Sequence, residues 1–273
     1  MAVGKCLLTG KNGTMAKAHL TPLALTEPAV PGCYFIEGGG GGRPIRSHTS
    51  WYDKKIVTHA GEKVLAEIDD WAIKFLREHK LVWSGWGEMS TMPPEWSEQL
   101  TPHTRVREIE SKDFGKLRLF FLSLLWRWAA ASIKAAKEIV IPKEHLEEIG
   151  RMILAGDAGD PSFYGMALVQ LSSKGPNHNL GPFADVLPIK YDDQEEPKLY
   201  RQFRFYLDGL IVKVFVDKLD AEDVGPAMLG FSDTLVFPAI DFEKSFQDDN
   251  MRQHMIEAEM FYPEDIKRLA GER

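Results

Sequence analysis

Two segments near the N-terminus hold the residue types that can do chemistry. They read KCLLTGKNGTMAKAHLTPLALT (residues 5–26) and SWYDKKIVTHAGEKVLAEIDDWA (residues 50–72). An imidazole, with an ordinary pKa of about 6.5, can accept a proton at neutral pH. Carboxylate oxygens are hard ligands that favour Mg²⁺ or Mn²⁺ over zinc. The chain lacks Gly-x-Ser-x-Gly, His-Glu-x-x-His and Gly-x-Gly-x-x-Gly, so it has no motif of a serine hydrolase, a zinc protease or a dinucleotide-binding site. No Lys-Ser/Thr pair follows its glycine run, which therefore does not match a phosphate-binding loop.

The two segments together resemble the HNH (ββα-metal) nuclease family, in particular its variants built on zinc knuckles. That pattern has Cys-x-x-Cys-Gly, then His-x-x-Pro, then a strand with Asn or Asp, then a second Cys-x-x-Cys that opens a helix. The corresponding stretches here are Cys6-Leu7-Leu8-Thr9-Gly10, His19-Leu20-Thr21-Pro22 and Thr58-His59-Ala60-Gly61-Glu62. Asp53 lies five positions before Thr58, as the middle residue of the family's triplet does. The resemblance covers about residues 5–80.

The resemblance implies a catalytic triplet of His19, Asp53 and Glu62. His19 would be the general base that activates water, and Asp53 and Glu62 would hold Mg²⁺ or Mn²⁺ against the scissile phosphate. His59 is a further candidate ligand. Asp69 lies two turns beyond Glu62 on the same helix face and would support the site.

The departures from the family pattern leave an alternative for each residue. Of the four knuckle cysteines only Cys6 remains, so no structural zinc is expected, and the metal site is either altered or inactive. His19 can be a loop histidine with a structural partner, and Asp53 a turn residue. Glu62 is favoured in the first turn of a helix by the helix dipole alone, and His59 can simply precede that helix.

Charge is unevenly distributed along the chain. Residues 1–63 carry eight basic and four acidic side chains, a net +4, which leaves −11 for the remainder of a chain whose net charge is −7. The basic part suits DNA, and the acidic part suits a protein partner or a homo-oligomer interface. Six basic side chains are candidates for phosphate contacts, with a solvated basic face as the alternative: Lys11, Lys17, Arg43, Arg46, Lys54 and Lys55.

The surrounding pattern predicts the elements that position these residues. Glycine and proline in residues 5–50 indicate short strands and loops, with Gly38 to Gly42 as a flexible connector. Apolar spacing predicts helices from Gly61, over 114–138 (apolar nearly all round), over 142–155 with a stop at Gly156, and over about 248–260. Strands are predicted at FYGMALVQL and TLVFPAI, and a hairpin at RQFRFYLDGLIVKVFVD with its turn at Asp208-Gly209.

These features together predict an α+β protein. Residues 1–90 would form an HNH-like ββα-metal domain, and residues 91–273 a helical and antiparallel β-rich region that binds substrate or a partner. An apolar fraction of 44% and no long apolar run predict a cytoplasmic protein without a membrane span. The expected function is a divalent-metal-dependent DNA endonuclease, as in bacterial defence against foreign DNA. The alternative is an inactive HNH-derived scaffold that binds DNA or a protein.

Overall fold

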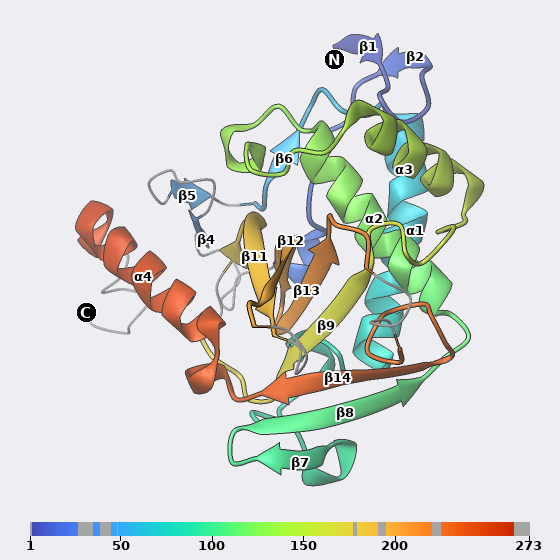
Figure 1. The fold of residues 1–273 in the computed structure, drawn as a ribbon. Helices are drawn as coiled ribbons and strands as arrows, with labels where there is room; N and C mark the ends of the chain where they lie inside the picture. The colour runs from blue at the N-terminus through green and yellow to red at the C-terminus, as the bar shows by residue number, and fades with distance from the viewer. Residues whose placement is uncertain are drawn as a thin grey trace.

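The computed structural model describes residues 2–26, 35–38, 45–47, 49–176, 179–190, 195–219 and 225–264, with only the backbone of 35–38 and 45–47. This part of the chain has a mixed α+β fold (Figure 1). Its helices are α1 (His59–Glu78), α2 (Phe114–Ala130), α3 (Lys143–Ala155) and α4 (Phe246–Phe261). Helices α1, α2 and α3 pack together on one side of the largest sheet, whereas α4 lies beyond the other side.

The largest sheet has seven strands in the order β11-β12-β13-β9-β14-β8-β7. Their bounds are β11 Phe183–Ile189, β12 Lys198–Leu207, β13 Leu210–Phe215, β9 Met166–Leu171, β14 Thr234–Ile240, β8 Thr104–Glu110 and β7 Glu98–Thr101. Strands β14 and β9 pair in parallel, and the other neighbours are antiparallel. An antiparallel β-rich region was predicted, and the pairings of this sheet agree except for the parallel pairing of β9 with β14, which inserts between β9 and β8.

The N-terminal strands lie in three small sheets. β1 (Val3–Lys5) pairs with β2 (Asn12–Thr14), and β3 (Ala18–His19) pairs with β6 (Tyr52–Asp53). β4 (Phe35–Gly38) lies between β5 (Ile45–Ser47) and β10 (Asn179–Leu180). Short strands and loops were predicted here, and the described residues agree. Residues 39–42 of the glycine run lie outside the described part.

Local sequence signals account for the best-predicted elements. Asp208 and Gly209 take positive φ angles of 49° and 86° in the tight turn between β12 and β13, as a two-residue hairpin requires. Gly156 ends α3 in the left-handed conformation, which glycine adopts without steric cost. The bounds of β14 coincide with the predicted strand TLVFPAI.

Helix α2 ends eight residues before its predicted end at residue 138. It is buried nearly all round, as predicted. Ala131 takes an extended conformation, and the Ser132 amide and hydroxyl donate hydrogen bonds to Asp53 Oδ2 at 2.7 and 2.9 Å. These long-range bonds direct the chain away from the helix axis, which apolar periodicity cannot reveal.

The main apolar core draws buried side chains from both sides of position 90, including Leu20, Leu65, Trp128 and Phe205. The division into residues 1–90 and 91–273 stays a prediction. A second cluster, which includes Trp83, Tyr206 and Met251, packs between the other face of the large sheet and α4. None of the described helices has the apolar length that a membrane span requires.

Candidate functional site

The candidate site lies where a two-stranded ladder leads into a helix. Ala18 pairs with Asp53 and His19 with Tyr52, and α1 begins six residues after Asp53. The backbone bonds from Leu20 N to Trp51 O (2.9 Å) and from Ala16 N to Val57 O (3.0 Å) extend this pairing. The two strands of this ladder and the helix occur in the order β3, β6, α1, with β4 and β5 between the two strands; His19 lies on β3 and Glu62 in the first turn of α1.

The four positions that the resemblance aligns with zinc-binding cysteines meet at a single sulfur atom. Thr9 N donates to Cys6 Sγ at 3.4 Å, in a turn closed by Gly10 N and Cys6 O at 2.9 Å. A Cβ atom on Gly61 would lie 2.7 Å from the same sulfur. Burial raises the pKa of the Cys6 thiol, but hydrogen bonds from Thr9 and Thr58 outweigh it and leave the pKa below its ordinary value. The two segments thus close around Cys6, a free and buried thiol.

His19 is half-buried and oriented by two neighbours. Its Nε2 atom lies 3.2 Å from Thr49 Oγ1, and its ring meets the Tyr52 ring edge-on at a centroid distance of 6.3 Å. Burial lowers the pKa of His19, and the positive charges of Lys17 and Arg127 lower it further against the opposing effect of Asp69. At neutral pH the imidazole is therefore uncharged and can accept a proton.

A buried ion pair lies beside His19. Arg127 of α2 donates two hydrogen bonds to the Asp69 carboxylate of α1, at 2.9 and 2.5 Å. It also approaches the carbonyl oxygen of His19 at 3.4 Å and Ser123 Oγ at 3.3 Å. The Arg127 side chain is 2% exposed and that of Asp69 is 16% exposed. This bidentate pair fixes α1, α2 and β3 relative to one another.

Glu62 is the residue of the predicted triplet that has a buried carboxylate oxygen without a hydrogen bond from the described residues. Its Oε2 atom is buried and has no hydrogen-bond partner in the described part of the chain. Burial raises the pKa of Glu62; Arg127 opposes this effect, and Asp69 adds to it. The Arg127–Asp69 ion pair thus affects the pKa of both His19 and Glu62.

Asp53 is buried, and both of its oxygens are occupied by protein donors. Oδ1 accepts from Lys55 N at 2.7 Å, and Oδ2 accepts from the amide and hydroxyl of Ser132. Its carboxylate therefore holds the end of β6 against the C-terminal end of α2. The structure shows no group of three or more His, Cys, Asp or Glu side chains, among the residues it describes, that could hold a metal ion. His59 is exposed at the start of α1. The metal roles of Asp53, Glu62 and His59 stay predictions.

Two of the basic candidates gather on the Tyr52 ring beside His19. Lys17 Nζ lies 4.0 Å from the ring centroid and Lys54 Nζ lies 5.8 Å from it. Lys11 and Lys55 are exposed. Arg46 belongs to β5, of which only the backbone is described, and Arg43 lies outside the described residues. Lys17 and Lys54 therefore place positive charge next to the candidate base.

Sequence reasoning gave no role to Arg127 or Ser132. The signal for Arg127 was present, because an arginine within the apolar run LFFLSLLWRWAAA must find a partner when that helix is buried. Ser132 gave no comparable signal. No protein-family model matches the chain, and no curated protein or solved structure matches it either.

Proposed function

We propose that the N-terminal segments form a zinc-free HNH-like unit that hydrolyses DNA phosphodiester bonds with the help of a divalent ion. One observation carries the proposal: the aligned knuckle positions of both segments meet at Cys6 Sγ. This convergence supports the alignment from which His19 and Glu62 were chosen. In this protein, packing of Thr58 and Gly61 against the sulfur takes the place of zinc.

His19 has the properties of a general base. Its uncharged imidazole is fixed by Thr49 and by strand β3, and it takes the proton from a water molecule as that water attacks phosphorus. Lys17 and Lys54 would bind the flanking phosphates and orient the DNA backbone over His19.

Glu62 is the residue best suited to hold the ion. Mg²⁺ is commonly bound through one or two carboxylates together with substrate phosphates, and the Glu62 carboxylate, whose Oε2 has no hydrogen-bond partner in the described part of the chain, fits this mode of binding. When bound, the ion would supply positive charge for the scissile phosphate and the leaving oxygen. Asp53 would act as a positioning residue, because its oxygens are used by Lys55 and Ser132.

A second candidate function is that of a scaffold that binds DNA or a protein without cleavage. The carboxylates of Asp53 and Asp69 favour it, because both already accept hydrogen bonds from protein groups. The acidic charge of residues 64–273 would then suit a protein partner or a second copy of the chain.

Plasmid cleavage separates the two functions. Supercoiled plasmid is incubated in Mg²⁺ or Mn²⁺ with one of four proteins: wild type, His19→Ala, Glu62→Gln or His103→Ala. The last is the control, because His103 is an exposed histidine in the β7–β8 hairpin. Cleavage by wild type and the control, reduced about 100-fold or more in His19→Ala and Glu62→Gln, is the expected result. Equal cleavage by wild type and His19→Ala, or no cleavage with either ion, would reject the nuclease. Retained DNA binding in a gel-shift assay without cleavage would favour the scaffold.

A further inference from the structure

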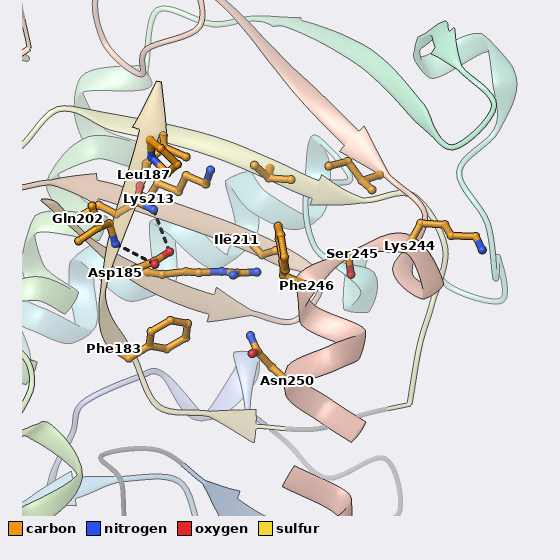
Figure 2. Close-up of a pocket in the computed structure, with 15 residues that line it drawn as sticks. Phe183, Asp185, Leu187, Gln202, Ile211, Lys213, Lys244, Ser245, Phe246 and Asn250 are labelled. Carbon is orange, nitrogen blue, oxygen red and sulfur yellow. Dashed lines mark hydrogen bonds between the residues drawn. The ribbon is translucent and has the colours of Figure 1, made fainter. Parts of the chain in front are cut away.

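A cavity of about 580 Å³ lies on the face of the large sheet that is directed toward α4 (Figure 2). Its floor is formed by side chains of β9, β11, β12 and β13, and its rim by residues at the start of α4. Phe246 and Asn250 of α4 lie opposite Phe183, Asp185 and Gln202 of the sheet (Figure 2). Pockets of this size hold small organic ligands.

The strand register places two cations side by side on the cavity floor. Arg204 of β12 is directly opposite Lys213 of β13, and on its other side it is opposite Phe183 of β11. The next row pairs Gln202 with Asp185. Like charges at directly opposed positions in a sheet repel each other and destabilise the fold. A bound anion would offset the repulsion between these two cations.

Neither cation has an ion-pair partner among the residues that the structure describes. Arg204 is 9% exposed, and its Nε atom is buried without a hydrogen-bond partner in that part of the chain. Asp185 is already used, because Oδ1 accepts from Val186 N at 2.8 Å and Oδ2 from Gln202 Nε2 at 3.1 Å. Burial lowers the pKa of Lys213, and the charge of Arg204 lowers it further against the effect of Asp185. Two partly desolvated positive charges thus face one cavity.

The rest of the lining suits a planar ring that carries polar edges. The Phe183 ring lies 5.8 Å from the Arg204 guanidinium, and Val169 and Ile211 add apolar surface. Phe246 is 75% exposed at the rim, where a bound ring would cover it. Within the described residues, Gln202 Oε1 is a buried acceptor and Asn250 Nδ2 a buried donor, and neither has a partner.

We propose that this cavity binds a phosphate monoester that carries a planar ring, such as a nucleoside monophosphate. The phosphate lies between Arg204 and Lys213, the ring packs against Phe183 and Phe246, and the amides of Gln202 and Asn250 bond to the ring edge. A guanidinium binds phosphate through paired hydrogen bonds, which would satisfy the buried Nε donor of Arg204. This site is separate from the candidate nuclease site and does not depend on it.

The test uses the full chain and adenosine monophosphate, with adenosine and inorganic phosphate as probes of the two halves. Isothermal titration calorimetry measures binding to wild type, Arg204→Met, Lys213→Met and the control Arg201→Met. Arg201 lies on the same strand but is exposed and ion-paired with Asp217, so its replacement removes the same charge away from the cavity. We expect the monophosphate to bind wild type and the control, and to bind each cavity variant at least tenfold more weakly. Adenosine should bind more weakly than the monophosphate.

The thermal midpoint of the unliganded variants gives an independent readout. If Arg204 and Lys213 repel each other and serve to bind a ligand, Arg204→Met or Lys213→Met should leave the thermal midpoint unchanged or raise it. Either change removes one of two neighbouring like charges. A fall in the midpoint of both variants would show that the cations serve the fold, and would overturn the proposal. Absence of binding by wild type at millimolar monophosphate would also overturn it, as would undiminished binding by both cavity variants.

Discussion

Replacement of Arg127 by methionine tests the electrostatic centre of the candidate nuclease site. The change retains much of the side-chain volume but removes both hydrogen bonds to Asp69, whose carboxylate stays largely buried. Loss of one partner of a buried pair costs about 3–5 kcal/mol of unfolding free energy, because the other charge is left without compensation. With an unfolding entropy of about 2.1 cal/mol/K per residue, a chain of 273 residues should lose roughly 5–9 °C in its thermal midpoint.

A double-mutant cycle provides the assay. Urea denaturation, followed by circular dichroism, is measured for wild type, Arg127→Met, Asp69→Asn and the double variant. The double variant has no uncompensated carboxylate, because both charges are removed. Its loss of unfolding free energy should therefore be smaller than the sum of the two single losses, by about 2 kcal/mol or more. Additive losses, or a loss below about 1 kcal/mol in Arg127→Met, would refute the view that this pair holds α1, α2 and β3 together.

Three further perturbations test other contacts of the site. Gly61→Ala should cost about 1–3 kcal/mol, because its Cβ would crowd Cys6 Sγ, and Cys6→Ala in the same chain should recover part of this loss in chemical denaturation. Glu62→Gln should raise the thermal midpoint at neutral pH. Burial raises the folded-state pKa of Glu62, so ionisation of its carboxyl lowers the stability of the fold as pH rises through that pKa. The gain in thermal midpoint from Gln should therefore vanish below the ordinary pKa of a glutamate carboxyl. A gain that is constant with pH would contradict this cause. Asp53→Ala should cost about 2–4 kcal/mol and speed hydrogen exchange at the Ser132 and Lys55 amides, whereas Ser132→Ala, which keeps the amide bond, should cost about 1 kcal/mol.

The elements that sequence predicted well have local causes. The Asp208-Gly209 turn and the end of α3 at Gly156 depend on backbone conformations that the residues themselves favour. Helix α1 follows from apolar residues at three- and four-residue spacing. In each of these elements, the determining signal lies within a few residues of the feature.

The features that sequence did not predict depend on distant partners. Ser132 leaves helix α2 to bond Asp53, which is 79 residues away in the chain. Strand β11 contains Pro188, and β7 is exposed along its length, so neither shows the apolar run of a central strand. The parallel pairing of β9 with β14 has no local signal at all.

The features of the candidate site likewise fall into those that the sequence indicated and those that depend on distant partners. The spacing of His19, Asp53 and Glu62 was available from the sequence through its resemblance to a family. The occupation of Asp53 by Ser132 and the effect of Arg127 on both His19 and Glu62 required the packing of α2 against α1. The partners of a charged side chain in a buried helix are determined by tertiary contacts. Its effect on the pKa of neighbouring groups therefore follows from the fold and not from the spacing of residues in the sequence.

The position of β14 has a consequence for how the protein assembles. Strands β7 and β8 precede all the other strands of the large sheet in the chain, yet they join it only through β14. During synthesis from the N-terminus, this hairpin has no strand to complete its edge until residues 234–240 have emerged. Pairing of such distant segments closes long loops and is slow. The exposed edge of β8 is therefore the part of the nascent chain most open to wrong pairing, and a ribosome stalled before residue 234 would hold the protein in that vulnerable state.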